Sequence, residues 1–168
     1  MKVSGFTFLR NAVISGYPFE ESIRSLLPIV DEYIVAVGEG QDDTLQRVNA
    51  IDDPKIRVIE TSWNENMRDR GFVYGQQKMV AQYNCSGDWA FYLEGDEVLH
   101  ESELPQIQEA MKANLDDERV EALYFKFFHF YGTPHQTGIA GYRKAPRIIR
   151  NTIRSIAPDG LFFVVLDK

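Results

Sequence analysis

The fold of this 168-residue chain is decided by the stretch Gly87-Asp88-Trp89-Ala90-Phe91-Tyr92-Leu93-Glu94-Gly95-Asp96-Glu97. Its unbroken apolar run, residues 89–93, predicts a strand buried on both faces, as at the centre of an α/β sheet. The strand is followed by three carboxylates, which we call the acidic cluster: Glu94, Asp96 and Glu97. Gly95, between them, allows backbone or a ligand to approach closely.

The acidic cluster is interpreted as a metal–diphosphate site. Carboxylate oxygens are the ligands that Mg²⁺ and Mn²⁺ prefer, and Mg²⁺ sites usually combine one or two carboxylates with substrate phosphates. Ligands of open α/β sheets bind at the carboxyl ends of the strands, which is where the cluster is predicted to lie. The alternative is an acidic turn that leads into a solvated helix.

The charge of the chain is unevenly distributed. A formal net charge of −7 and a pI near 5.0 argue against sequence-independent binding to a nucleic-acid polymer or to an anionic membrane, which relies on Lys and Arg. The segment 126–154 nevertheless contains no acid, and its basic residues are Lys126, Arg143, Lys144, Arg147, Arg150 and Arg154. This segment could face an anionic ligand.

Cysteine content and hydropathy bear on location. The single cysteine, Cys85, excludes an intrachain disulfide and is typical of a reducing compartment. The N-terminus has no apolar signal region, and no apolar run approaches transmembrane length. We therefore expect a cytoplasmic protein without a transmembrane segment.

The pattern along the chain is strand–helix–strand–helix–strand with short connections, which predicts a parallel sheet with right-handed crossovers. An apolar stripe on the first helix (Phe19, Ile23, Leu26, Leu27 and Val30) predicts that it packs on the sheet. Asp42 or Asp43 is expected to cap the second helix, and Ser102 the fourth. Strands are predicted at 3–9, 33–37, 56–60, 89–93, 120–130, 147–150 and 161–166, helices at 18–30, 44–50, 73–83 and 102–115, and loops at 63–71 and 131–138.

These landmarks together resemble glycosyltransferase family 2, the nucleotide-diphospho-sugar transferases of the GT-A fold, over about residues 3–100. The opening strand and helix match, and the second strand is followed by Asp42-Asp43-Thr44, which is similar to the family's Asp-x-Thr. Glu94-Gly95-Asp96-Glu97 resembles its Asp-x-Asp signature. The resemblance implies one GT-A-like domain over residues 1–168, an α/β protein with three α/β/α layers and a central, mainly parallel sheet.

The resemblance also implies a metal site. In the family, the acidic signature holds a divalent cation, Mn²⁺ or Mg²⁺, that bridges the diphosphate of the sugar nucleotide. Carried over, Asp96 is the first choice of metal ligand, Glu94 contacts ribose or metal, and Glu97 is a third candidate. A dication can neutralise the diphosphate and stabilise its departure as the glycosidic bond breaks.

The same resemblance assigns residues to the nucleotide-sugar donor. The residues implied on the donor side are Phe8, Arg10, Asn11, Glu39, Arg70, Lys78, Glu94 and Gly95. Lys78 or Arg70 would contact phosphate, and the alternative for Lys78 is a solvated helix face. The family usually has an Asp at the end of the second strand, where this chain has Val37 and Gly38, so the nearest acid, Glu39, is displaced.

An inverting transferase needs a general base for the acceptor hydroxyl, usually a later carboxylate. From residue 125 onward the chain has only Asp159 and Asp167. Asp159, in Pro158-Asp159-Gly160, is the candidate catalytic base, and a turn residue is the alternative. The chain stops two residues after an apolar run, which indicates either a minimal domain or a fragment truncated at its C-terminus.

The acceptor side is assigned to His129, Arg143 and Arg147, which could hold an anionic acceptor or a phosphate. The alternative is that the arginines only balance the acidic surface. The acceptor stays open between a saccharide and a lipid-linked molecule, and UDP is one candidate for the nucleotide. Our first hypothesis is a metal-dependent, inverting glycosyltransferase. The second is a shortened GT-A-like module that binds a nucleotide sugar or a partner without catalysis, as the missing clear base favours.

Overall fold

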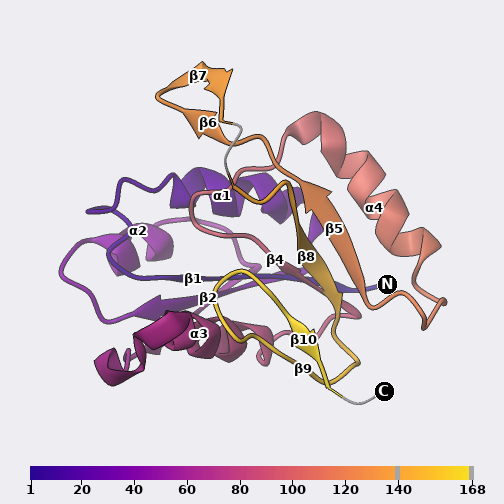
Figure 1. Ribbon diagram of the computed structural model, residues 1–168, viewed down its shortest axis with the longest axis horizontal. Coiled ribbons are helices and arrows are strands. Elements are labelled where there is room, and N and C mark those ends of the chain that lie inside the picture. The colour runs from indigo at the N-terminus through magenta and orange to yellow at the C-terminus, as the bar shows by residue number, and fades with distance from the viewer. Residues whose placement is uncertain (139–140, 167–168) are drawn as a thin grey trace.

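The computed structural model describes residues 1–138 and 141–166, and a six-stranded sheet lies at its centre (Figure 1). The strand order is β3-β2-β1-β4-β8-β5. β1, β2, β3 and β4 run parallel to one another, whereas β8 is antiparallel to both β4 and β5. The strand bounds are β1 Val3–Leu9, β2 Glu32–Gly38, β3 Ile56–Thr61, β4 Trp89–Tyr92, β5 Ala122–Lys126 and β8 Lys144–Arg150.

β1 and β4 form the middle of the sheet, in parallel register with Val3 opposite Trp89 and Phe6 opposite Tyr92. All four residues of β4 are buried, as its continuous apolar run predicts. Alternate residues of β1 enter different cores, because successive side chains of a strand point to opposite faces. Leu9 packs on one side, and Phe6 on the other.

Helices cover both faces of the sheet, which confirms the three-layer α/β/α architecture. In Figure 1, α1 (Phe19–Leu26), α2 (Thr44–Asn49) and α4 (Leu104–Ala113) lie above the sheet, and α3 (Phe72–Gln82) lies below it. The predicted stripe of α1 is buried at Phe19, Ile23 and Leu26. Within the described ranges, none of the helices combines the length and the apolarity needed to cross a bilayer.

The C-terminal segment shares the α3 face of the sheet. β9 (Ser155–Ile156) pairs with β10 (Val164–Val165), and the chain between them packs against the sheet beside α3. Phe163 contacts Phe6 and Tyr92 edge to face, at centroid distances of 6.4 and 6.1 Å. This segment therefore completes the core below β1 and β4.

The structure differs from the predicted elements after residue 120. The strand predicted over 120–130 ends at Lys126, because its partner β8 begins at Lys144, which pairs with Lys126. The chain then forms a hairpin of β6 (Phe130–Tyr131) and β7 (Thr133–Thr137), where a loop was expected, turning at Gly132 with φ of 73°. Of the strand predicted at 161–166, only β10 pairs.

Smaller corrections concern helix ends and the loop at 63–71. His100, not Ser102, caps the short turn η4 (Glu101–Glu103) before α4, since its ring accepts a hydrogen bond from the Ser102 amide. Asp42 accepts hydrogen bonds from the Thr44 amide and hydroxyl at the start of α2. The predicted loop contains the 3₁₀ turns η2 (Glu65–Met67) and η3 (Asp69–Gly71).

Candidate functional site

A cleft of about 480 Å³ opens at the carboxyl ends of β1 and β4. The chain leaves β1 to form β2 and β3 on one side and returns to β4 on the other, so these two strands flank the point where the strand order reverses. Ligands of open α/β sheets bind at such a point. The lining includes Phe8, Arg10, Asn11, Tyr17, Trp63, Arg68, Tyr74, Tyr92, Glu94, Gly95, Asp96 and Gly160.

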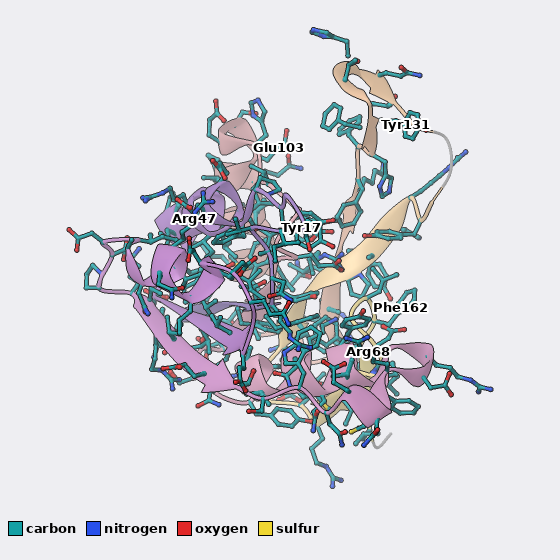
Figure 2. All side chains as sticks on the ribbon, turned by 90° about the vertical axis from the view of Figure 1, so that its left-hand side faces the viewer. Tyr17, Arg47, Arg68, Glu103, Tyr131 and Phe162 are labelled. Carbon is teal, nitrogen blue, oxygen red and sulfur yellow. The ribbon has the colours of Figure 1, made fainter. Side chains whose placement is uncertain are left out.

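Figure 2 looks onto this edge of the sheet, with Tyr17 and Arg68 on different sides of the sheet's carboxyl ends. Gly95 lies close to β1, since a Cβ built on it would be 2.6 Å from Leu9 Cδ2. The close approach that Gly95 was expected to allow is therefore made by the chain itself. It brings the acidic end of β4 against the end of β1.

One end of the cleft is aromatic. Phe8 stacks on Tyr92 with a centroid distance of 6.2 Å and an interplanar angle of 7°, and Trp63 meets Tyr74 edge to face at 5.6 Å. Trp63 Nε1 is buried and has no hydrogen-bond partner among the described residues. A flat base could stack against these rings, since aromatic faces accept any base.

Trp63 also explains why β2 ends in glycine. A Cβ built on Gly38 would lie 2.2 Å from Trp63 Nε1, so only glycine leaves room for the indole. The family resembled by the sequence has an Asp near this point, and here an indole occupies the space beside the strand end. Glu39 lines a second cavity, of about 410 Å³, together with Asp42 and Glu60, and not the main cleft.

Arg10 and Arg68 bring positive charge to the cleft. Arg10 Nε donates to the Glu39 carbonyl at 2.8 Å, and its guanidinium lies 5.2 Å from the Trp63 ring centroid. Both arginines pair with Glu65. This shared carboxylate holds two side chains suited to binding phosphate at one edge of the cleft.

The acidic cluster is occupied by Arg147 of β8. Its Nη2 donates to Glu94 Oε1 at 2.8 Å and to Glu97 Oε1 at 2.6 Å, and its Nε donates to Glu97 Oε2 at 2.8 Å. The Arg147 side chain is 1% exposed. Its guanidinium also lies 5.3 Å from the Tyr92 ring centroid. Arg147, Glu94 and Glu97 therefore form one ionic group that joins β8 to the end of β4.

This pairing bears on two of the predicted roles. Arg147 is not available on the acceptor side, because both of its charged edges are bonded to Glu94 and Glu97. Those two carboxylates are in turn not free metal ligands, and no three His, Cys, Asp or Glu side chains in the described ranges are placed to hold an ion. Asp96 remains exposed on the cleft, which fits a dication only if substrate phosphates complete its coordination.

Burial sets the protonation of the acidic cluster. Desolvation raises the pKa of Glu94 to about 7, the Glu97 carboxylate acts in the same direction, and Arg147 opposes both. Desolvation and Glu97 likewise raise the pKa of Asp96 above its usual range. A cation close to Asp96 would favour its ionised form.

The Glu94→Gln variant is expected to change the pH dependence of stability. Folding raises the pKa of Glu94, so the protonated carboxyl group stabilises the folded state. This stabilisation is fully present below pH about 4.5 and is lost as the pH rises through about 7. Relative to Glu94→Gln, the wild type should lose on the order of 3 kcal/mol of its free energy of unfolding over that range. Urea unfolding at several pH values measures this, with the exposed Glu118→Gln as control. Parallel profiles for wild type and Glu94→Gln would contradict the burial argument.

Lys78 has neither of its predicted roles. It is fully buried, its Nζ donates to the carbonyls of Gly160 and Phe162 at 3.1 and 3.2 Å, and it lies between two aromatic rings, 4.1 Å from Tyr92 and 3.7 Å from Phe163. Desolvation lowers its pKa to about 7. The Lys78 ammonium binds the C-terminal segment below the cleft. It lies neither on a solvated helix face nor in the cleft lining.

Asp159 accepts hydrogen bonds from the Leu161 and Phe162 amides, both at 2.8 Å, which is the turn role that stood as the alternative to catalysis. Arg70 has φ of 52° and an exposed side chain, and it is not among the residues that line the cleft. Asp167 lies outside the described residues. The described chain therefore offers no carboxylate after residue 125 that points into the cleft.

The predicted acceptor residues do not form one group. His129 Nε2 lies 2.7 Å from the Tyr142 carbonyl and stacks on Phe127, so it supports the base of the hairpin. Arg143 is exposed on the segment just before β8, and Arg147 is buried against the acidic cluster. Of the donor residues, Phe8, Arg10, Asn11, Glu94 and Gly95 are brought together by the cleft, although Asn11 Oδ1 also accepts from the Gln41 amide.

Sequence reasoning missed Tyr17, Trp63, Arg68, Tyr74 and Tyr92 as cleft residues. Trp63 and Arg68 follow β3, and the carboxyl ends of parallel strands meet at the same edge of a sheet. That rule could have placed both residues. Tyr92 was predicted only as a buried residue of the central strand, and not as part of a binding cleft.

Comparisons with known proteins place the fold. No protein-family profile and no curated protein matches the sequence. Among solved structures, S. aureus TarS 1–349 in complex with UDP-GlcNAc matches with 20% identity and a TM-score of 0.53, over 68% of this chain and 32% of that one. Glucosyl-3-phosphoglycerate synthase from Mycobacterium tuberculosis matches with 21% identity: its UDP complex has a TM-score of 0.53 over 77% of this chain and 45% of that one.

A second complex of the synthase, with Mn²⁺, UDP and phosphoglyceric acid, matches with a TM-score of 0.52 over 74% of this chain and 42% of that one. The chain thus spans a third to less than half of the length of these structures. At such identities the likeness shows the fold, and the GT-A-like α/β class predicted from the sequence is confirmed.

Proposed function

We propose that residues 1–168 form a single glycosyltransferase domain that binds a UDP-sugar in the cleft at the ends of β1 and β4 and transfers the sugar to an acceptor. The observation that carries the proposal is the composition of that cleft. It joins an aromatic end, a pair of arginines and one free carboxylate at the switch point of the sheet. These are the groups that a base, a diphosphate and a bridging cation each require.

The donor would lie along the cleft with its uracil toward Trp63 and Phe8. Stacking of a base on an aromatic side chain contributes about 1–3 kcal/mol in nucleic-acid complexes. Arg10 and Arg68 would then face the diphosphate, in place of Lys78 and Arg70. Both arginines pair with Glu65, which keeps the two guanidinium groups near each other at this edge of the cleft.

Asp96 would hold a divalent cation together with the diphosphate oxygens. When bound, such a cation neutralises charge that develops on the departing diphosphate. One of the similar structures is a complex of the synthase with Mn²⁺, UDP and phosphoglyceric acid, which supports this choice. Glu94 and Glu97, tied to Arg147, would instead hold the Asp96 loop in place.

The transfer is proposed to invert the sugar by direct displacement. It needs a base for the acceptor hydroxyl, and Asp159 is engaged in its own turn. This observation favours the second candidate function, a domain that binds the nucleotide sugar without catalysis. The two candidates share the donor site and differ only in whether the bound sugar is transferred.

Calorimetric titration of UDP and GDP, each with and without Mn²⁺, tests the donor site. We expect UDP to bind more tightly with Mn²⁺ than without it, and Trp63→Ala to weaken UDP binding about 10-fold or more through lost stacking. The exposed Phe72→Ala serves as control. Failure of UDP to bind under both conditions would remove the proposal, and hydrolysis of a bound UDP-sugar would distinguish the enzyme from the binder.

A further inference from the structure

The β6–β7 hairpin stands apart from the three layers of the fold (Figures 1 and 2). The aromatic residues of the hairpin and of the segment that leads into it are among the most exposed of the described chain: Phe128 is 81%, Phe130 65% and Tyr131 73% exposed. Tyr131 is labelled on the protruding arm in Figure 2. Large apolar side chains that gather on a protrusion mark an interaction surface more often than scattered ones do.

The exposed side chains alternate with supporting ones. Phe127, His129 and Tyr142 are half-buried and pack on one another, with centroid distances of 5.1 to 6.0 Å. The residues between them are exposed, and with their neighbours they form what we call the hairpin strip: Tyr124, Lys126, Phe128, Phe130, Tyr131 and Lys144. The inner rings therefore hold the strip outward, away from the core.

The strip lies in the basic part of the chain. Residues 122–158 contain no Asp or Glu, and Lys126, Arg143 and Lys144 are all exposed where the hairpin joins β5 and β8. Lys126 and Lys144 face each other across the two strands. The overall charge of −7 argues against attraction to an anionic surface, but charges beyond about 10 Å are largely screened at physiological salt. The positive charge close to the hairpin therefore governs its electrostatic interactions with a binding partner.

We propose that the hairpin strip docks on an anionic lipid bilayer, with its aromatic side chains in the interfacial layer and its lysines on the headgroups. Aromatic rings are enriched at the membrane–water interface, and exposed Lys and Arg near the surface bind anionic lipids. A second copy of this chain fits less well. A two-fold contact through the strip would bring two copies of the same lysine-bearing, acid-free surface together, so their charges would repel. The inference does not depend on the donor site.

Co-sedimentation with vesicles tests the proposal. Vesicles of equal parts phosphatidylcholine and phosphatidylglycerol should bind the chain about 10-fold or more tightly than phosphatidylcholine alone, and high salt should weaken this binding. Phe128→Ser/Phe130→Ser and, separately, Lys126→Gln/Lys144→Gln should each reduce it about 10-fold. The control is Ile14→Ser/Phe72→Ser, which removes two exposed apolar side chains outside the strip and should bind as the wild type does.

Three results would overturn the proposal. The first is equal binding to both kinds of vesicle, or binding to neither. The second is a loss in the control variant as large as in the strip variants. The third is self-association, measured by light scattering, that Phe128→Ser/Phe130→Ser abolishes while vesicle binding is absent, which would assign the strip to a second copy of the chain.

Discussion

Replacing Arg147 with methionine is expected to lower the free energy of unfolding by about 3–5 kcal/mol, because it removes a fully buried cation and leaves the two half-buried carboxylates of Glu94 and Glu97 unpaired. Arg147 is 1% exposed and donates to both Glu94 and Glu97. Methionine keeps much of the side-chain volume, so the loss reports charge and not a cavity. Denaturant unfolding at neutral pH measures it.

The triple variant Arg147→Met/Glu94→Gln/Glu97→Gln separates charge from packing. It removes the unpaired charges together with the arginine and should recover most of the lost stability, since a buried ion pair replaced as a whole is often neutral in effect. Arg143→Met, an exposed arginine near the same strand, should stay within about 0.5 kcal/mol of the wild type. If Arg147→Met were as stable as Arg143→Met, the ionic group would not be holding β4 to β8.

Replacing Asp96 with asparagine is expected to weaken Mn²⁺-dependent UDP binding by at least about 10–100-fold, the loss that results when a group that merely supports a metal ligand is removed. Asp96 is exposed on the cleft and takes no part in the hydrogen bonds of Arg147 to Glu94 and Glu97. The fold should therefore be unaffected. Calorimetric titration of UDP with and without Mn²⁺ measures the change.

The metal-free titration makes the test of Asp96 specific. Without Mn²⁺, Asp96→Asn should bind UDP as well as the wild type or better, because a carboxylate near the diphosphate has been removed. Asp43→Asn, an exposed aspartate outside the cleft, should behave as the wild type in both titrations. An equal loss with and without Mn²⁺ would mean that Asp96 contacts the nucleotide directly and holds no cation.

Local pattern was enough to predict the architecture. The apolar runs of β1, β2 and β4 and the stripe of α1 depend on neighbours within a few residues, and their buried positions are confirmed. The exit of β4 into the acidic cluster was also readable, because strand ends in a parallel sheet meet at one edge. The loop after β1 was assigned to the donor side through the resemblance to glycosyltransferase family 2, and Phe8, Arg10 and Asn11 line the cleft.

Patterns failed where an element's partner lies far along the chain. The strand predicted over 120–130 was too long because only the start of β8 limits it, and the exposed aromatics of the hairpin look like core residues in sequence. Alternating aromatic residues in a sequence do not indicate whether their side chains are covered by another element. Most of the proposed membrane contact therefore comes from residues that were predicted to belong to the strand over 120–130.

The sequence alone determined the alternation of strands and helices, the central strand and the presence of acid at its end, since each rests on local pattern. Only the tertiary structure decided what those acids do. Arg147 reaches Glu94 and Glu97 from 53 and 50 residues away, Lys78 reaches Gly160 from 82, and each contact turns a candidate ligand-binding charge into a structural one. Whether a charged side chain is free or paired depends on which distant strand packs beside it. A buried charge needs such a partner, because leaving it unpaired costs several kcal/mol.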